Sequence, residues 1–324
     1  MNPQALRSAL LTWYREHKRD LPWRENRDPY RVWLSEVMLQ QTRVAAVIDY
    51  YREFLRLFPT VEKLAAARES NILAAWSGLG YYRRARMLHA AAKAVVREHG
   101  SKVPSSAARL SDLPGIGRYT AAAIASIAFD EPVPVVDGNV ERVLSRLSGK
   151  QMFGERAWSA AGELLDPGHP GDFNQAMMEL GATVCTPRTP MCQSCPIVEL
   201  CATRSELPRS RKSPKQEKRE IHYALFRRSE KRRVARVLLV QRGRDASLMA
   251  GMWELPQIEA KEGCSRADFT LRHSITVTDY KVHVWQIFED TPQHSSGKWI
   301  SKSKLASVPL TGLARKILRR AKML

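Results

Sequence analysis

The sequence lacks any apolar run long enough to cross a membrane, which takes about 18 residues. It also lacks a secretory pattern at its start, because Leu6, Leu10, Leu11 and Trp13 alternate with Arg and Glu at helical spacing. No internal repeat and no low-complexity tract is present. We therefore expect a cytoplasmic protein without a membrane segment.

Acidic residues are scarce relative to basic ones. Lys and Arg number 52 against 33 Asp and Glu, which gives a formal charge of +19 over 324 residues. An excess of this size indicates a polyanionic partner, nucleic acid first and an anionic membrane surface second. Apolar residues make up 44%, which excludes a disordered chain, and the length predicts two or so domains.

Cysteines are also few, and four of the five fall within residues 185 to 201. This distribution does not resemble a secreted disulfide framework. Six residues separate Cys185 from Cys192, two separate Cys192 from Cys195, and five separate Cys195 from Cys201. Structural zinc normally uses two short-spaced pairs, whereas four thiolates along one compact loop suit a cubane iron–sulfur cluster. The spacing favours the cluster over zinc and over free buried cysteines.

A glycine turn interrupts two segments, 106–112 and 117–129, that have helical patterns. Gly115 and Gly117 flank Ile116. Two glycines allow a sharp turn and leave N–H groups exposed at the positive end of the second helix. Such a helix-hairpin-helix, here 106–129, grips a nucleic-acid phosphate without reading a base. An ordinary helix-capping turn is the alternative. The basic charge, an Asp just after the second helix and the cysteine loop favour the phosphate site.

The hydrophobic period changes along the chain. Residues 4 to 204 have helical periodicity broken by Pro and Gly, which predicts an all-α domain, residues 1–204. Residues 205–220 are basic and contain Pro and Ser, as in a linker. Residues 221–324 favour a small α+β domain, with strands at 221–226, 234–240 and 276–288 and a basic helix at 310–323.

Two carboxylic acids stand out in the helical region. Glu36 is the one acid among the apolar residues of a helix that begins at Pro29, and it is followed by polar residues suited to hydrogen bonding with bases, Gln40, Gln41 and Thr42. A solvated helix glutamate is the alternative. Asp137 follows the small-residue helix, where it could also cap a helix beginning near Val140.

A second loop, 78–82, contains Leu79, Tyr81 and Tyr82 and precedes Arg83, Arg84 and Arg86. Apolar and aromatic side chains beside cations can wedge between bases or stack on them. Aromatic residues that belong to the protein core are the alternative.

These motifs together resemble the A/G-mismatch adenine DNA glycosylases (MutY family) of the helix-hairpin-helix superfamily. The resemblance covers nearly all of residues 4–204. The matching stretches are LPWR at 21, WLSEVMLQQT at 33, GLGYYRRAR at 78, LPGIG at 113, VVDGNVERVLSR at 135, FNQAMMELGA at 173 and the cysteine loop. It implies a 4Fe-4S cluster on the four cysteines and double-stranded DNA with adenine opposite 8-oxoguanine or guanine as the partner. It also implies a monomer that is associated with the nucleoid.

The resemblance assigns roles at the active site. When the N-glycosidic bond of adenine is cleaved, the sugar becomes an oxocarbenium-like cation. The reaction therefore needs a proton donor for the departing adenine and a negative charge near the sugar. Glu36 matches the acid and Asp137 the carboxylate. Relatives that also cut the strand have Lys where this chain has Tyr119, so a monofunctional enzyme is expected. Tyr119 and Asn139 are expected to orient the site, and Gln175 to contact the flipped base.

Further DNA contacts follow from the same match. Gln41 and Tyr81 match residues that enter the base stack near the opposite guanine. Ser274 and Thr276 lie where the family has a Phe-Ser-His turn beside the oxidised guanine, and no such turn is evident here. The full expected set is Arg24, Gln40, Gln41, Thr42, Leu79, Tyr81, Gly115, Gly117, Gln175, Ser274 and Thr276.

The stretch LMAGMWELP at 248–256 resembles the family's C-terminal domain, which is similar to Nudix hydrolases. The Glu-rich metal-binding helix of those hydrolases is missing, so no nucleotide hydrolysis is expected. Two rival functions stay open. One is a catalytically silent protein that binds lesions or mismatches, and retention of both Glu36 and Asp137 argues against it. The other is a superfamily glycosylase for another base, such as thymine or a damaged pyrimidine.

Overall fold

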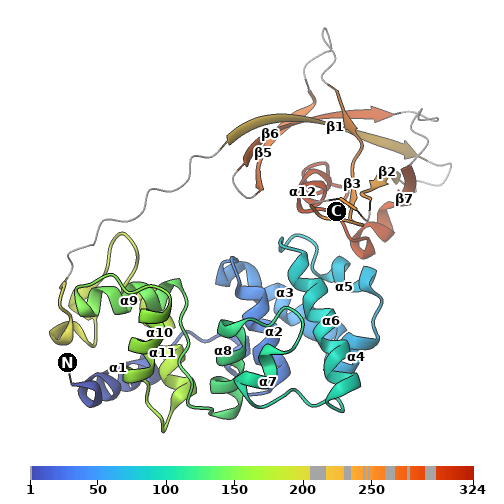
Figure 1. Ribbon diagram of the computed structural model, residues 1–324. Coiled ribbons are helices and arrows are strands. Elements are labelled where there is room, and N and C mark those ends of the chain that lie inside the picture. The colour runs from blue at the N-terminus through green and yellow to red at the C-terminus, as the bar shows by residue number, and fades with distance from the viewer. Residues whose placement is uncertain are drawn as a thin grey trace. The chain divides into compact units, whose positions relative to one another are not determined.

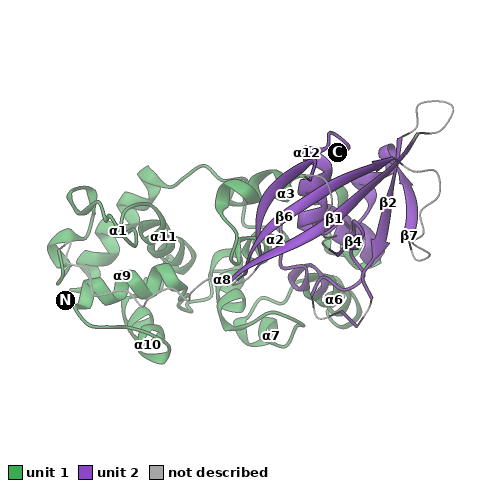
Figure 2. Ribbon diagram, turned by 90° about the horizontal axis from the view of Figure 1, so that it is seen from above, with its two compact units in different colours: residues 1–66, 87–211 green, residues 67–86, 212–324 purple. Residues whose placement is uncertain are grey.

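The computed structural model describes residues 2–204, 217–229, 235–243, 245–246, 248–259, 267–275, 278–288 and 297–324. The chain forms two compact units, coloured separately in Figure 2. Unit 1 comprises residues 1–66 and 87–211, and unit 2 comprises residues 67–86 and 212–324. The boundary near 211 falls inside the predicted linker 205–220, of which residues 205–216 lie outside the described residues. Residues 217–220 were wrongly assigned to the linker, because they begin a strand. The grouping of 67–86 with the C-terminal residues was not predicted.

The chain up to residue 204 is helical, as predicted (Figure 1). Its α-helices are α1 (Pro3–His17), α2 (Pro29–Leu39), α3 (Val44–Leu57), α4 (Val61–Ala66), α5 (Glu69–Ala75), α6 (Arg83–Glu98), α7 (Ala107–Ser111), α8 (Arg118–Phe129), α9 (Gly138–Ser148), α10 (Glu155–Leu164) and α11 (Pro170–Thr183). Three short 3-10 turns accompany them, η1 (Pro22–Arg24), η2 (Cys192–Ser194) and η3 (Val198–Leu200).

Local sequence signals explain why α2 begins where it does. Asp28 caps the helix by accepting a hydrogen bond from the backbone N–H of Arg31 at 2.8 Å, and Pro29 occupies the first turn. The helix then buries Trp33, Leu34 and Met38 completely. Glu36 lies on the same helix and is carried into the interior with them.

Unit 1 places α2, α8, α9 and α11 around one region. Helix α8 contacts α2, α7 and α11, and α11 also contacts α1 and α9. The crossing of α8 and α11 is close because a Cβ on Gly171 would lie 2.5 Å from the carbonyl oxygen of Ser126. Glycine is therefore required there, and the side chains of α2, α8 and α11 meet near the start of α9.

Unit 2 contains a mixed sheet. Its strands are β1 (Glu217–Ser229), β2 (Ala235–Gln241), β3 (Trp253–Glu254), β4 (Gln257–Ile258), β5 (Phe269–Ile275), β6 (Thr278–Phe288) and β7 (Gly297–Ser301), followed by η4 (Lys302–Ser307) and α12 (Gly312–Arg320). The order is β3-β2-β1-β6-β5, with β4 paired to β1 and β7 paired to β2. Strands β1 and β6 run parallel, and the other pairs are antiparallel.

The α+β prediction for the second domain is confirmed, including the basic terminal helix, which is α12. Leu313, Ile317 and Leu318 of α12 pack into the same core as Leu225 of β1 and Val284 of β6. Strands β3, β4, β5 and β7 were not predicted from the sequence. Within the described residues, no helix is long and apolar enough to cross a membrane.

Candidate active site

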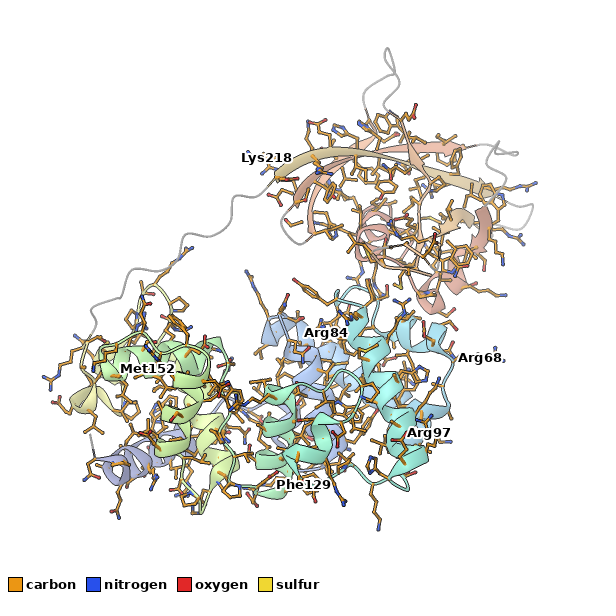
Figure 3. All side chains as sticks on the ribbon, in the orientation of Figure 1. Arg68, Arg84, Arg97, Phe129, Met152 and Lys218 are labelled. Atoms are coloured by element: carbon orange, nitrogen blue, oxygen red, sulfur yellow. The ribbon has the colours of Figure 1, made fainter. Side chains whose placement is uncertain are left out.

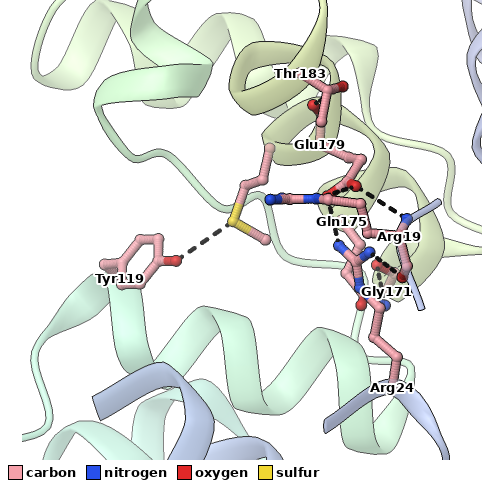
Figure 4. Close-up of polar contacts among 8 residues, drawn as sticks. Arg19, Arg24, Tyr119, Gly171, Gln175, Glu179 and Thr183 are labelled. Atoms are coloured by element: carbon pink, nitrogen blue, oxygen red, sulfur yellow. Dashed lines mark hydrogen bonds and ion pairs between the residues drawn. The ribbon is translucent and has the colours of Figure 1, made fainter. Parts of the chain in front are cut away.

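Glu36 and Tyr119 form the centre of the site. Glu36 on α2 is only 7% exposed. The Tyr119 hydroxyl on α8 donates a hydrogen bond to Oε2 of Glu36 at 2.9 Å. The same hydroxyl lies 3.3 Å from the sulfur of Met178 on α11, the contact drawn from Tyr119 in Figure 4. The alternative of a solvated glutamate at position 36 is therefore wrong. Three helices hold this carboxyl in an enclosed place.

The environment of Glu36 favours its protonated form. Its pKa is raised from 4.5 to about 7, chiefly by burial and to a smaller extent by the negative charge of Asp137. The hydrogen bond from Tyr119 and the positive charge of Arg24 act in the opposite direction. Burial prevails because a carboxylate loses most of its hydration in this setting. Glu36 thus holds a transferable proton near neutral pH.

Asp137 precedes α9 and accepts hydrogen bonds at both of its oxygens. Oδ1 accepts from the backbone N–H groups of Asn139 at 2.9 Å and Val140 at 2.8 Å, and Oδ2 accepts from the Asn139 side chain at 2.8 Å. Asp137 is thus the helix cap that the sequence offered as an alternative. Its charge also acts on Glu36 and Tyr119, which places the two carboxyls within electrostatic range. Capping holds the carboxylate in a fixed orientation and does not exclude a chemical role.

Arg142 connects Asn139 to the cysteine loop, a link that the sequence analysis missed. Its guanidinium donates to the Asn139 side-chain oxygen at 2.8 Å, to the Gly181 carbonyl at 2.7 Å and to the Cys185 carbonyl at 2.9 Å. Burial lowers its pKa. The available signal was its position three residues after Asn139, which puts both on one face of α9. Asp137, Asn139, Arg142 and Cys185 form one continuous chain of contacts.

Gly181 permits the close approach of α11 to the start of α9. A Cβ at this position would lie 2.6 Å from the Asn139 Cβ and 3.1 Å from its carbonyl oxygen. Any larger residue would displace Asn139 or α11. The spacing between these helices therefore depends on glycine.

The four cysteines surround one small cavity of about 30 Å³. Arg146 anchors the loop, because its guanidinium donates to the Cys185 sulfur at 3.1 Å and to the carbonyls of Thr186 at 2.8 Å and Pro187 at 3.1 Å. The pKa of the Cys195 thiol is raised to about 11, chiefly by burial and to a smaller extent by the neighbouring cysteines. In the described ranges no three His, Cys, Asp or Glu side chains are arranged to hold a metal ion. All four thiols nevertheless line this one space.

The predicted helix-hairpin-helix is confirmed as α7, a glycine turn and α8. Gly115 has a φ of +76°, and a Cβ on it would lie 2.4 Å from the Cβ of Met87, so only glycine fits. Gly117 is the N-cap of α8 and has no side chain to cap it. The first N–H groups of α8 are therefore available to an anion. Phosphate binding here stays a prediction.

Gln41 and Tyr81, the two residues expected to enter the base stack, share an unusual backbone. Their φ angles are 55° and 49°, and within the described residues only five other non-glycine residues have positive φ. Both side chains are exposed, Tyr81 by 48%. A left-handed conformation of a bulky residue costs on the order of 1–3 kcal/mol and persists where the surroundings impose it. Leu79, also expected to contact DNA, is only 7% exposed.

The polar residues beside Gln41 are turned toward the protein. Gln40 donates to the hydroxyl of Thr120 at 3.2 Å, and the Thr42 hydroxyl donates to the Gln40 carbonyl at 3.2 Å. Both side chains are half-buried. Their predicted contacts with bases stay untested.

Arg24 and Gln175 lie beside the active site in internal contacts (Figure 4). Arg24 is bound to Glu179 at 2.8 Å, and its side chain is 13% exposed. Arg19 binds the same carboxylate at 2.7 Å. Burial raises the pKa of Glu179, but the hydrogen bonds from both arginines prevail and lower it to about 2. Gln175 donates to the Gly171 carbonyl at 3.4 Å.

Of the two residues expected beside the oxidised guanine, only Ser274 is described. It is exposed on β5, and its hydroxyl donates to the carboxylate of Asp279 on β6. Thr276 lies outside the described residues.

Unit 1 thus combines a helix-hairpin-helix with two electrostatically coupled carboxyls. Residues 34–156 match the HhH-GPD superfamily of base excision DNA repair proteins. A solved structure of a thermostable thymine-DNA glycosylase superposes with a TM-score of 0.59 and 31% identity. The match covers 62% of this chain and 96% of that one.

The particular family follows from curated relatives. The adenine DNA glycosylase of Mus musculus is 42% identical over 312 residues, covering 78% of this chain and 60% of the relative. That of Schizosaccharomyces pombe is 32% identical over 321 residues, covering 79% of this chain and 70% of the relative. The chain belongs to the adenine DNA glycosylase family. It spans 40% to 60% of the length of the mammalian and plant members that it matches.

Proposed function

We propose that this protein is a base-excision repair glycosylase that hydrolyses the N-glycosidic bond of adenine mispaired with 8-oxoguanine or guanine in double-stranded DNA. The observation that carries the proposal is Glu36, a buried carboxyl whose pKa is raised to about 7 within electrostatic range of Asp137. A proton donor and a fixed carboxylate are the two groups that this reaction requires. Family membership adds the choice of adenine.

In the proposed reaction, Glu36 donates its proton to a ring nitrogen of adenine that has been flipped out of the duplex. The electron pair of the glycosidic bond leaves with the base, and the sugar becomes positively charged at its anomeric carbon. The Asp137 carboxylate stabilises this cation until water attacks. The capping bonds from Asn139 and Val140 fix the carboxylate in place, so little reorganisation is needed as charge develops.

Tyr119 supports a monofunctional enzyme. It lies at the position where strand-cutting relatives are expected to carry Lys, and its hydroxyl is bonded to Glu36. Burial raises the pKa of Tyr119 well above its usual value, so it stays a neutral hydrogen-bond donor. We expect abasic sites without strand cleavage. Borohydride quenching should trap no amine-linked DNA, and strand breaks before alkali treatment would contradict this role.

We further infer that Cys185, Cys192, Cys195 and Cys201 hold a 4Fe-4S cluster. All four line the same cavity, and Arg146 donates a hydrogen bond to one of the sulfurs, as expected beside negatively charged thiolates. The cluster, when bound, would supply a structural anchor for the loop. Purified protein should contain about four iron and four sulfide per chain. Stoichiometric zinc without sulfide would favour the zinc alternative.

The deciding experiment for activity uses three duplexes, with A opposite G, A opposite 8-oxoguanine, and T opposite G. After incubation, alkali cleaves any abasic site. We expect cleavage at adenine in the first two duplexes and none in the third. Cleavage at thymine would favour the rival base preference, and binding without cleavage would favour a silent mismatch-binding protein. Glu36→Gln should bind each adenine duplex as the wild type does and release no base.

Several finer expectations stay predictions. These are the monomeric state, the cytoplasmic and nucleoid-associated location, the domain limits 1–204 and 221–324, the resemblance of the second domain to Nudix hydrolases, and a role of Ser274 and Thr276 beside 8-oxoguanine. A deletion after Arg204 tests the last of these, because it keeps both carboxyls and all four cysteines. Loss of the preference for A opposite 8-oxoguanine would support it, and an unchanged preference would remove it.

A further inference from the structure

One backbone carbonyl from the C-terminal segment holds the loop that carries Tyr81. The hydroxyls of Ser77 and Tyr82 both donate to the carbonyl of Leu310, at 2.7 and 3.2 Å. Ser77 and Leu310 are fully buried, and Tyr82 is 5% exposed. All three residues belong to unit 2, coloured purple in Figure 2. The Tyr82 hydroxyl also accepts from the backbone N–H of Gly78 at 3.2 Å, so the start of the loop is tied to the same point.

The tip of this loop is held by stacking. The guanidinium of Arg84, labelled near the start of α6 in Figure 3, lies 5.5 Å from the Trp76 ring and 5.4 Å from the Tyr81 ring. Arg84 and the Trp76 indole N–H both donate to the Gly80 carbonyl, at 3.2 and 3.1 Å. Trp76 is fully buried. Arg84 therefore connects the buried ring of Trp76 to the exposed ring of Tyr81.

Tyr81 is the one strained part of this arrangement. Its ring is exposed and its backbone is left-handed, which bulky residues adopt only where their surroundings impose it. The contacts at Gly78, Gly80 and Leu310 supply that constraint. A loop fixed in this way loses less conformational freedom when it engages a ligand than a free loop would.

We propose that Ser77 and Tyr82, through the Leu310 carbonyl, are positioning residues that preset Tyr81 for entry into the base stack of duplex DNA. The C-terminal segment around Leu310 thereby contributes to distorting the DNA without contacting the mispair. The inference rests on the proposed function in taking double-stranded DNA as the partner and Tyr81 as a residue that enters its base stack. It assigns the role to two buried hydroxyls and one carbonyl.

The test uses full-length protein carrying Glu36→Gln, so that the base is retained, and a duplex with 2-aminopurine beside an A opposite 8-oxoguanine mispair. Base unstacking on binding raises 2-aminopurine fluorescence. Ser77→Ala and Tyr82→Phe each remove one hydroxyl, and we expect each to weaken binding by about threefold and the double variant by about tenfold. The double variant should also lose at least half of the fluorescence increase, as Tyr81→Ala should.

Tyr30→Phe is the matched control. The Tyr30 hydroxyl is also buried and donates to a backbone carbonyl, that of Phe58 at 2.8 Å, but it lies in unit 1. It should lower the thermal midpoint without changing fluorescence or affinity. Ser77→Thr, which keeps the hydroxyl, should preserve both readouts.

Two results would overturn the proposal. One is wild-type fluorescence and affinity in the double variant at a temperature where it is folded, since the hydroxyls would then be only structural. The other is a wild-type response in Tyr81→Ala, since the loop would then have no part in unstacking. If the double variant does not fold, the single variants decide. Adenine release by the protein with native Glu36 is measured separately, so failure of the proposed activity is distinguishable from failure of this inference.

Discussion

Glu36→Gln should stabilise the protein above neutral pH while abolishing adenine release. The folded protein binds the Glu36 proton with a pKa of about 7, whereas the unfolded chain has the usual 4.5. Between these values the folded state holds a proton that the unfolded state has released. The free energy of unfolding therefore falls as pH rises from 4.5 to 7 and stays lower above it. Above pH 7 the buried, charged carboxylate destabilises the folded state, and the neutral glutamine side chain removes that cost.

The size of the effect follows from the pKa difference. Each unit is worth about 1.36 kcal/mol, so the shift from 4.5 to about 7 corresponds to about 3 kcal/mol at pH 8. At pH 5 the folded Glu36 is neutral while most of the unfolded glutamate is already ionised, so the same linkage leaves a difference of only about 0.8 kcal/mol. Glutamine also retains an oxygen that can accept the Tyr119 hydrogen bond. The measurement is the urea midpoint of each protein by circular dichroism at pH 5 and pH 8.

Glu16→Gln is the control, because the Glu16 side chain is 66% exposed. It should change stability by less than about 0.5 kcal/mol at both pH values. Two results would show that burial does not raise the pKa of Glu36. One is a Glu36→Gln variant that is no more stable than the wild type at pH 8, and the other is a gain in stability over the wild type that is as large at pH 5 as at pH 8. The account of Glu36 as a proton donor near neutral pH would fail with it.

Three further predictions concern the groups around the two carboxyls. Tyr119→Phe removes a hydrogen bond that lowers the pKa of Glu36, so the alkaline limb of the single-turnover pH profile should move up by about one unit; a downward shift would contradict the assignment. Arg142→Met should lower adenine release at least about tenfold with iron content retained, and unchanged release would remove its positioning role. Gly181→Ala should also lower release by about tenfold or more, whereas Gly162→Ala, whose Cβ meets only Pro134 at 3.8 Å, should not; equal rates would contradict the close-approach argument.

Features that depend on neighbouring residues could be predicted from the sequence. The start of a helix at Pro29, the glycine turn at Gly115 and the period change placed at residue 221, four residues after β1 begins, each depend on a few adjacent positions. That Glu36 and Asp137 lie within electrostatic range of each other could be expected only from the family resemblance, because the two residues belong to separate helices. The burial of Glu36 could be anticipated, since its helical neighbours are apolar.

Features that depend on distant segments could not be predicted. The Ser77 hydroxyl contacts a carbonyl 233 residues away, and no local pattern encodes that pairing. Strand β5 was missed because its polar residues, including Arg272, His273 and Ser274, weaken the apolar alternation. It pairs with β6 from Phe269 to Ile275, which supplies the order that its own sequence does not indicate.

The two residues expected to enter the base stack illustrate where sequence reasoning and structure meet. The sequence motifs identified Gln41 and Tyr81 by residue type. They gave no reason why Gln and Tyr, rather than glycine, should occupy positions with a left-handed backbone conformation. Glycine would remove the strain and would also remove the side chain that we expect to enter the base stack. The strain is tolerated because contacts elsewhere fix the loop, in the case of Tyr81 through Arg84 and the Leu310 carbonyl. Tyr81→Gly should therefore fold at least as stably as Tyr81→Ala while losing the same unstacking, and this comparison separates the strain from the function.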